Sequence, residues 1–410
     1  MQHDRARLRT IVGLTPCTRR APLITDTRSD IQTDVHGTCG PRFEAVRDAF
    51  AANFTSGEDL GASVSVVLEG QPVVDLWAGY ADGDRTRPWE RDTIVNVYST
   101  TKTMTALSAL LLADRGELDF HAPVARYWPE FAQNGKAAIE VRHLMSHSSG
   151  LSGWDQPITA DDLYDWDRVT SLLAAQAPWW EPGTASGYHA VSQGYLVGEV
   201  VRRASGQSLG AFFRDELATP LGADFHIGLP PSEDTRVADL QPPEELAADT
   251  APDDGTVAAR TLRNPRLTAL EPRSSEWRRA EIPAAGGIGN ARSVARVQSL
   301  LACGGELDGR RLLSEAGCAA VFDEQTNGTD LVLGLPVIFG MGYGLNGPER
   351  LLSPNPRTCY WGGWGGSVVI VDLDARLCFS YVPNRMASTT TGDMRSYSIN
   401  RAVYASLGLI

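Results

Sequence analysis

Strand patterns lie at the two ends of this 410-residue chain, and helical patterns fill the long stretch between them. Near the N-terminus, ASVSVVLEGQPVVDLWAGYAD (62–82) holds two runs rich in β-branched residues around Glu69-Gly70-Gln71, which predicts a β-hairpin. Near the C-terminus, TCYWGGWGGSVVIVDLDARLCFSYVPNRM (358–386) predicts a second hairpin that closes at Asp372 to Arg376. Strands from both ends can then share one sheet, on which the middle of the chain folds as a helical subdomain.

Apolar residues recur at helical spacing in several stretches. The clearest, TMTALSALLLADRGEL (103–118), carries Met104, Leu107 and Leu111 on one stripe and ends near Gly116. The expected fold class is α/β of the α+β type: a mainly antiparallel sheet built from N- and C-terminal strands, flanked by helices, with an inserted helical subdomain at about 115–285. This domain spans 39–410 with a ligand cleft between its lobes, and the polar residues 1–38 are expected to form a flexible arm. The other expected helices lie at 41–54, 189–206, 209–222, 294–305 and 394–407.

The formal net charge of −13 argues against nucleic acid and anionic membranes as partners. The N-terminal MQHDRARLRTIVGLTPCTRR lacks the apolar core of a secretory signal, and no segment approaches the length of a membrane span. Six cysteines are scattered without CxxC spacing, so neither a metal knot nor a disulfide scaffold is expected. We therefore expect a soluble, cytoplasmic protein with reduced thiols, and the sequence leaves its oligomeric state open.

Residues 230–256 form a Pro-rich acidic stretch with eight acids and one arginine. A loop of this length is usually a lid, a rim or an insert. We expect a solvated surface excursion, with a substrate-selecting rim as the alternative.

The stretch VYSTTKTMTAL (97–107) places Ser99 three residues before Lys102, at the start of an apolar helix. Positions i and i+3 share one helix face. Only two of the 37 basic residues are lysines, Lys102 and Lys136, and a buried amine can lose its proton whereas a guanidinium cannot. Lys102 could thus be the base that turns Ser99 into a nucleophile. A serine N-cap followed by a surface lysine is the alternative.

Two other stretches could complete such a site. Tyr188 lies in a turn before an apolar helix, where a phenol whose pKa is lowered by nearby cations could shuttle protons. The stretch YWGGWGGS (360–367) is a poor ordinary strand, and its glycines favour close approach of a ligand to the backbone, with an N–H available for an oxyanion hole. Taken singly, Tyr188 could be an ordinary core or surface tyrosine, and the glycines a bulge or tight packing.

The order of these three elements resembles the serine β-lactamase and penicillin-binding-protein superfamily. The resemblance is to its class C-like branch, and most closely to the family VIII carboxylesterases, over about residues 40–410. Four further stretches support it: VRHLMSHSSGL (141–151), PGTASGYHAVSQGYLVGEVV (182–201), PAAGGIGNARSVARV (283–297) and FGMGYGL (339–345).

The resemblance implies that Ser99 is the nucleophile, Lys102 the general base or proton relay and Tyr188 the partner base and acid. It also implies an oxyanion hole formed by the backbone N–H groups of Ser99 and Trp364. No metal and no organic cofactor is expected.

Two departures from the family pattern bear on the substrate. The family's Tyr-x-Asn is Tyr188-His189-Ala190 here, and its Lys-Thr-Gly is Trp361-Gly362-Gly363. Replacing a cation by an indole turns an anion site into an apolar one, so neutral, apolar esters are favoured over antibiotics and peptidoglycan. His189 and Trp154 are further candidate substrate contacts, and each could equally be structural.

The sequence thus predicts a serine hydrolase that acts on small-molecule carboxylic esters through an acyl-Ser99 intermediate. The main alternative is an acyltransferase that passes the acyl group to an amine or alcohol acceptor with the same residues. A β-lactamase or D-aminopeptidase is disfavoured by Trp361 and Ala190, and a non-catalytic binding protein by the intact Ser99, Lys102 and Tyr188.

Two other motifs are given structural interpretations. GQSLG (206–210) matches a nucleophile elbow, but a helix rather than a strand precedes it, so Ser208 is expected to be an N-cap. His143 and His147 have a metal-like spacing without a third ligand, and packed or turn-capping histidines are expected instead.

Overall fold

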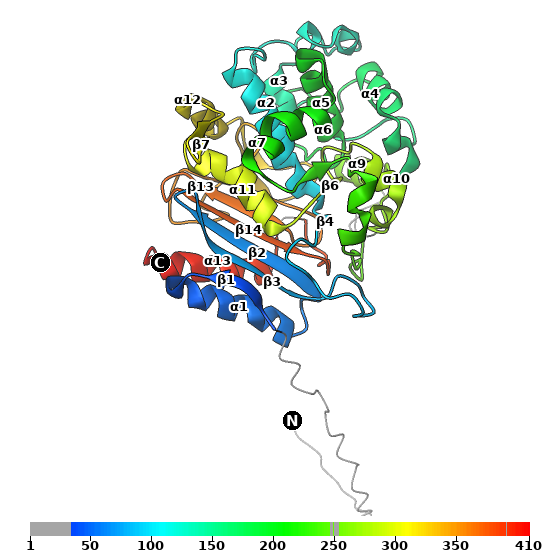
Figure 1. Cartoon of the computed structure of the whole chain (residues 1–410). Helices are drawn as coiled ribbons and strands as arrows, with labels where there is room; N and C mark the ends of the chain where they lie inside the picture. Colours follow the sequence, from blue (N-terminus) through cyan, green and yellow to red (C-terminus); the bar gives the residue numbers. More distant parts are fainter. Residues whose placement is uncertain (1–33, 247–248, 250–253, 391) are drawn as a thin grey trace, which may run out of the picture. The chain divides into compact units, whose positions relative to one another are not determined.

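The computed structural model describes residues 34–246, 249, 254–390 and 392–410 (Figure 1). Its centre is a nine-stranded antiparallel sheet in the order β1-β3-β2-β14-β13-β12-β11-β10-β9. The two hairpins that the sequence predicts, β2–β3 and β13–β14, are neighbours in this sheet, because β2 pairs with β14 from Leu68↔Leu377 to Ala62↔Pro383. The expected fold class is therefore confirmed. The strands are β1 (His36–Cys39), β2 (Gly61–Leu68), β3 (Gln71–Gly79), β9 (Thr326–Thr329), β10 (Pro336–Phe339), β11 (Gly344–Leu345), β12 (Thr358–Gly362), β13 (Val368–Asp372) and β14 (Leu377–Pro383).

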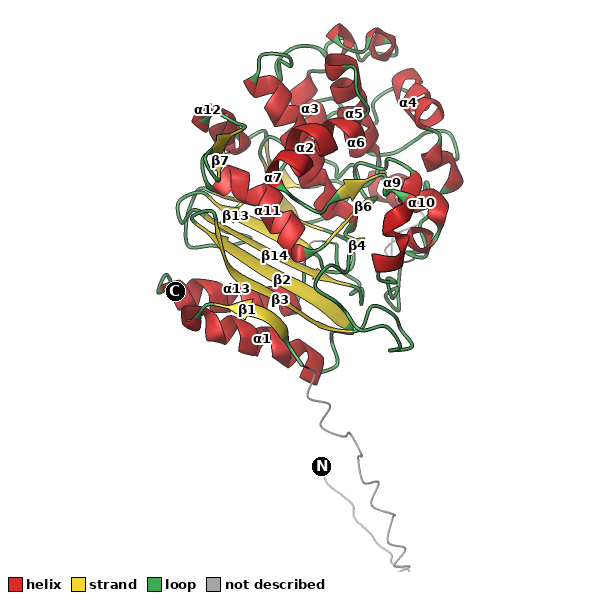
Figure 2. Ribbon diagram, viewed as in Figure 1, coloured by secondary structure: helices red, strands yellow, loops and turns green. Residues whose placement is uncertain are grey.

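Helices cover both faces of this sheet (Figure 2). Helices α1 (Glu44–Thr55) and α13 (Met394–Leu407) pack against each other on one face, and α11 (Ala291–Ala302) lies on the opposite face against β2 and β14. Strand β2 is accordingly buried on both sides: Val64 and Val66 join the core beneath α1 and α13, while Ser63 Oγ accepts a hydrogen bond from Ala291 N.

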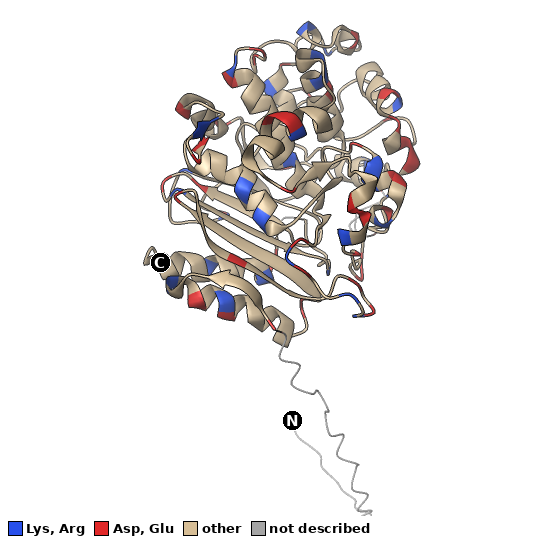
Figure 3. Cartoon of the chain, in the orientation of Figure 1, with Lys and Arg blue, Asp and Glu red and all other residues tan. Residues whose placement is uncertain are grey.

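Helix α2 (Thr101–Asp114) runs through the middle of the helical part and is buried from Thr101 to Leu112. Its residues are buried on every face of the helix, as expected of a helix in the centre of a core. Charged residues lie mainly on the peripheral helices and loops, and the central strands carry few (Figure 3). The other helices of this part are α3 (Val141–Met145), α4 (Trp166–Ala175), α5 (Ser192–Ser205), α6 (Leu209–Phe213), α7 (Thr219–Leu221), α9 (Val257–Leu262), α10 (Ser275–Arg279) and α12 (Glu315–Ala319), of which α5, α6 and α12 contact α2.

The structure also has two small sheets. Strands β4 (Val95–Asn96), β6 (Gly287–Gly289) and β5 (His226–Ile227) form an antiparallel sheet beside the start of α2. Strands β7 (Glu306–Leu307) and β8 (Arg310–Arg311) form a short hairpin.

The acidic stretch differs from its prediction. Residues Pro231–Arg236 form a 3-10 helix, and Val237, Ala238 and Leu240 are buried. Gln241 N then donates to Asn384 O, next to the end of β14. The prediction of a solvated excursion is therefore wrong for 237–241, where Val237, Ala238 and Leu240 are buried, whereas Pro231–Arg236 contains no buried residue. Residues 247–248 and 250–253 lie outside the described residues.

The structure describes only the end of the N-terminal arm expected at residues 1–38. Residues 1–33 of the expected arm lie outside the described residues, whereas His36–Cys39 form β1 and pair with β3. Among the helices in the described part of the chain, none has the length and apolarity to cross a bilayer. The cytoplasmic location stays a prediction from the sequence.

Candidate active site

Ser99 lies in the 3-10 turn η2 (Tyr98–Thr100), which leads directly into α2. The preceding residue, Tyr98, has φ +45°, a left-handed conformation that costs a bulky residue about 1–3 kcal/mol. Thr101 Oγ1 donates to Tyr98 O at 2.5 Å and accepts from Gly287 N at 2.9 Å, so that β6 secures this turn. The strained turn presents Ser99, 8% exposed, at the wall of a cavity.

Lys102 is buried beside Ser99, with its Nζ 3.1 Å from Ser99 Oγ. The same Nζ donates to Ala190 O at 2.7 Å and to Ala284 O at 3.0 Å. Burial lowers the pKa of Lys102 well below its usual value, which favours the neutral amine. A neutral amine has two N–H groups and one lone pair, and the two carbonyls account for the N–H groups. The lone pair is then free to accept the proton of Ser99.

Tyr188 contacts the same oxygen, donating its hydroxyl to Ser99 Oγ at 2.6 Å. Burial raises the pKa of Tyr188, and the contact with Ser99 opposes this shift only in part. The expectation of a phenol pKa lowered by cations is therefore wrong. Lys102 Nζ does lie 4.8 Å from the Tyr188 ring centroid, but burial favours its uncharged form. The geometry suits Lys102 as the base and Tyr188 as a proton donor.

Asp330, which the sequence analysis did not identify, holds the backbone of Tyr188 in place. Its buried Oδ1 accepts hydrogen bonds from the backbone N–H groups of Tyr188, Val332 and Leu333, each at 2.9 Å. One carboxylate oxygen thus fixes both the tyrosine and a segment of the cavity wall, since Val332 and Leu333 line the cavity.

The glycine-rich stretch approaches the nucleophile turn closely. A Cβ on Gly363 would lie 2.1 Å from Val97 O, so only glycine fits there. Ser367 Oγ donates to Val97 O at 2.8 Å and shares a second 2.8 Å hydrogen bond with Thr100 Oγ1. These contacts join the turn that carries Ser99 to the segment that carries Trp364, and both residues line the same cavity.

That cavity has a volume of about 370 Å³ and is predominantly apolar. None of its lining residues in the described part of the chain carries a charge. The lining residues are Tyr98, Ser99, Tyr188, Ala190, Val191, Ala258, Thr261, Leu262, Pro265, Leu267, Ala285, Val332, Leu333, Trp364, Ser388 and Thr390.

None of the five predicted substrate contacts, Trp361, Gly362, Gly363, His189 and Trp154, is among the residues that line this cavity. Trp361 and Gly362 end β12, and the Trp361 ring packs 5.4 Å from the Tyr188 ring and 5.3 Å from that of Phe339, behind the cavity. His189 is buried, shares a 2.7 Å hydrogen bond with Ser149 through Nε2, and burial lowers its pKa to about 3. Trp154 donates Nε1 to Val169 O within the helical core.

His189 and Trp154 thus have the structural contacts that the sequence left open as the alternative for each. Trp361 packs against the Tyr188 ring and supports it from outside the cavity. Ala190 stands at the position of the family's asparagine, and its backbone carbonyl accepts a hydrogen bond from Lys102 Nζ.

The two discounted motifs have the structural roles expected of them. Ser208 Oγ accepts from Ala211 N as the N-cap of α6, and Gly206 ends α5 in a left-handed conformation. His143 Nδ1 accepts from Glu140 N, and His147 Nδ1 from His189 N. Within the described ranges no group of three or more His, Cys, Asp or Glu side chains could hold a metal ion.

Comparisons with known proteins identify the family of the chain. The family model described as Beta-lactamase matches residues 46–404. Esterase/beta-lactamase LipL of Mycobacterium tuberculosis (strain ATCC 25618 / H37Rv) is 38% identical over 369 residues, which cover 86% of this chain and 84% of LipL. The crystal structure of a family VIII carboxylesterase superposes with a TM-score of 0.86 at 44% identity, covering 91% of this chain and 100% of the other. A penicillin-binding protein homolog from Caulobacter crescentus has a TM-score of 0.84 at 40% identity, with 91% and 100% covered. The chain belongs to the beta-lactamase family.

Proposed function

We propose that this protein is a serine esterase that hydrolyses neutral carboxylic esters through an acyl-Ser99 intermediate. The observation that carries the proposal is the placement of one hydroxyl between two proton-transfer groups. Ser99 Oγ lies 3.1 Å from Lys102 Nζ and 2.6 Å from the Tyr188 hydroxyl, at the edge of an uncharged cavity. A serine needs such an adjacent base to become a nucleophile.

Acylation begins with attack of Ser99 Oγ on the ester carbonyl carbon, while the hydroxyl proton passes to Lys102 Nζ. The carbonyl π electrons move to oxygen, and the N–H groups of Ser99 and Trp364 stabilise the resulting oxyanion. The oxyanion then collapses, the bond to the alkoxy oxygen breaks, and the alcohol leaves with a proton that Tyr188 donates. Lys102 returns a proton to Tyr188, so both groups regain their starting forms.

Deacylation repeats these steps with water as the nucleophile. Water gives a proton to Lys102 as it attacks the acyl carbon, and the bond to Ser99 Oγ breaks as Ser99 recovers its proton. The carbonyls of Ala190 and Ala284 stabilise the transient ammonium, because they already lie within 3.0 Å of Nζ.

The cavity supports a neutral, apolar substrate. A charged acyl group would lose hydration without finding an opposite charge on the described walls. Trp361 also stands where related enzymes that bind carboxylates have a lysine. We therefore expect little turnover of β-lactams relative to short-chain aryl esters, measured side by side with nitrocefin and p-nitrophenyl butyrate.

The direct test is intact-mass analysis after exposure to a fluorophosphonate, which forms an Oγ–P bond and releases fluoride. Wild type and Ser208→Ala are expected to gain one adduct and Ser99→Ala none. Ser208→Ala is the matched control, because Ser208 is the other serine with a nucleophile-like sequence context. Labelling of Ser99→Ala, or no labelling of wild type, would overturn the proposal.

Acyl transfer is the second candidate, since a predominantly apolar cavity can favour an organic acceptor over water. The same acyl-Ser99 would pass its acyl group to an alcohol or amine. Product analysis of p-nitrophenyl butyrate turnover with added alcohols and amines separates the two: the free acid marks hydrolysis, and the new ester or amide marks transfer.

A further inference from the structure

We infer that Arg395 is a positioning residue for the oxyanion hole: its guanidinium holds the Gly365 carbonyl and so fixes the turn that presents the Trp364 N–H. This inference deepens the proposed function and rests on it. Arg395 lies at the start of α13, outside the cavity, and has no contact with the reacting atoms.

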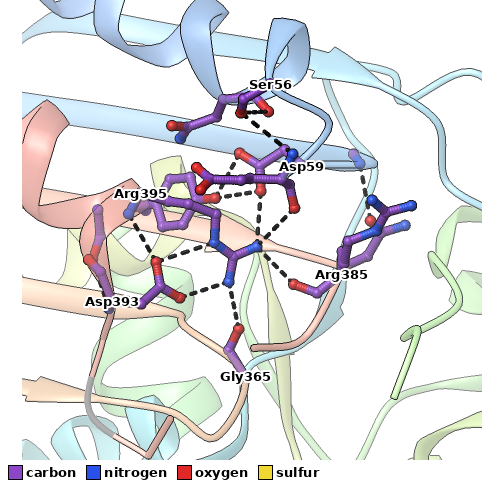
Figure 4. Close-up of polar contacts among 12 residues, drawn as sticks. Ser56, Asp59, Gly365, Arg385, Asp393 and Arg395 are labelled. Carbon is purple, nitrogen blue, oxygen red and sulfur yellow. Dashed lines mark hydrogen bonds and ion pairs between the residues drawn. The ribbon is translucent and has the colours of Figure 1, made fainter. Parts of the chain in front are cut away.

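The guanidinium of Arg395 is buried and its donors are all engaged (Figure 4). Nε and Nη2 donate to the two oxygens of Asp393 at 3.1 and 2.7 Å, and Nη1 donates to Asp59 Oδ1 at 3.0 Å. Nη1 also donates to Arg385 O at 2.8 Å, and the second Nη2 hydrogen bond goes to Gly365 O at 2.9 Å. Two carboxylates thus hold one rigid cation in place, and from there it reaches the backbone carbonyls of Arg385 and Gly365.

Gly365 is held on both of its sides. Its carbonyl accepts from Ala387 N at 3.0 Å as well as from Arg395, and its N–H donates to Thr389 O at 3.0 Å. The next residue, Gly366, has φ +118°, and a Cβ there would lie 2.5 Å from both the Arg395 and Asp393 side chains. The turn is therefore pressed against the cluster of Asp59, Asp393 and Arg395.

This glycine turn also orients the Trp364 N–H, the proposed oxyanion donor. The N–H of Trp364 shares a peptide group with the carbonyl of Gly363, and peptide groups are planar. Gly363 O accepts from Gly366 N at 3.1 Å, so the placement of Gly366 sets the direction of that peptide and of the Trp364 N–H. A shift at Gly365 passes directly to this donor.

Lysine at position 395 would keep the charge but could not reproduce the contacts. An ammonium lacks the planar fork that grips Asp393 with two parallel hydrogen bonds while reaching Asp59 and Gly365. In Arg395→Lys the turn should loosen, and the Trp364 N–H should lose its fixed direction. Loss of one oxyanion donor typically costs 10²–10³-fold in kcat, and we expect partial misalignment to cost about 10- to 100-fold.

The matched control is Tyr381→Phe. Tyr381 donates to both oxygens of Asp59, at 2.6 and 2.7 Å, so its loss weakens the same buried cluster but leaves the Arg395–Gly365 contact in place. We expect both variants to lower the midpoint of urea unfolding, and only Arg395→Lys to lower kcat for p-nitrophenyl butyrate, with KM within about twofold of wild type.

A second readout targets the oxyanion itself. A trifluoromethyl ketone forms a tetrahedral adduct: Ser99 Oγ bonds to the ketone carbon, the carbonyl electrons become an oxyanion, and the serine proton passes to Lys102. Its affinity for Arg395→Lys should fall by the same factor as kcat, and its affinity for Tyr381→Phe should not. An equal loss of kcat in both variants, or a loss confined to KM, would overturn the inference.

Two further results distinguish a folding defect and a failed proposed function from a failed role of Arg395. If Arg395→Lys does not fold, Asp393→Asn loosens the same fork, and an unchanged kcat in that variant overturns the inference. If wild type itself forms no adduct at Ser99, the proposed function has failed, whereas an adduct that forms equally well in wild type and Arg395→Lys refutes the role of Arg395 alone.

Discussion

Asp330→Asn tests whether the carboxylate behind Tyr188 matters for both stability and catalysis. Its Oδ1 accepts three backbone hydrogen bonds at 2.9 Å, and its Oδ2 has no partner among the described residues. Hydrogen bonds to a charged group contribute about 1.5–3 kcal/mol and neutral ones about 0.5–1.5, so three weakened bonds amount to about 3 kcal/mol. The smaller desolvation cost of an amide offsets part of this loss, and we expect the free energy of unfolding to fall by about 2 kcal/mol.

The catalytic effect should accompany the loss of stability. If the backbone of Tyr188 is held less firmly, its hydroxyl moves away from Ser99 and transfers protons less efficiently. Because this weakens but does not remove the acid–base contact, we expect kcat/KM to fall about 10-fold. Urea unfolding and p-nitrophenyl butyrate hydrolysis measure the two effects. Asp323→Asn, an exposed carboxylate seven residues earlier, is the control and should change stability by less than about 0.5 kcal/mol. Wild-type stability and activity in Asp330→Asn would refute the reasoning.

The remaining predictions concern the two lysines and one glycine. Lys102→Arg should lose at least about 10³-fold in kcat/KM, because a guanidinium cannot accept the Ser99 proton; near-normal turnover would exclude Lys102 as the base. In wild type, kcat/KM should fall as acid protonates Lys102, whose pKa burial has lowered, and a pH–rate profile without that limb would contradict the assignment. Burial lowers the pKa of Lys136 to about 8, so the unfolded state binds more protons above that pH. The free energy of unfolding of wild type minus that of Lys136→Met should then rise between pH 8 and 10.5 by on the order of 1–3 kcal/mol. Urea titrations of both proteins measure this difference, and a difference that does not change with pH would contradict the prediction. Gly363→Ala should abolish most activity, because its Cβ would meet Val97 O at 2.1 Å, and full activity would mean that the turn can move away.

The sequence predicts those parts of the fold that local patterns specify. The two hairpins, α13 over Met394–Leu407 and the N-cap role of Ser208 all follow from spacing and turn chemistry along short stretches. The sharing of one sheet by strands from both ends also follows, because each hairpin needs a partner to bury its apolar face.

The roles of Asp330 and Arg395 could not be predicted in the same way. Asp330 bonds a residue 142 positions earlier in the chain, and Arg395 bonds Asp59 across 336 positions. Locally, Asp330 shows only the pattern of a turn, and Arg395 only that of a capped helix start. Trp154 shows the opposite limit of local patterns. It lies close to the site motifs in the sequence, but its side chain packs in the hydrophobic core.

The burial of both lysines also governs how the folded protein meets amine-reactive chemistry. Lys102 and Lys136 are 1% and 0% exposed, and the chain has no other lysine. Succinimidyl dyes, glutaraldehyde and activated resins therefore find no lysine amine on its surface, whereas carboxylates, with 50 Asp and Glu in the chain, are plentiful targets for carbodiimide coupling. Acyl transfer to surface lysines, a common side reaction of activated esters, is therefore closed to the folded protein.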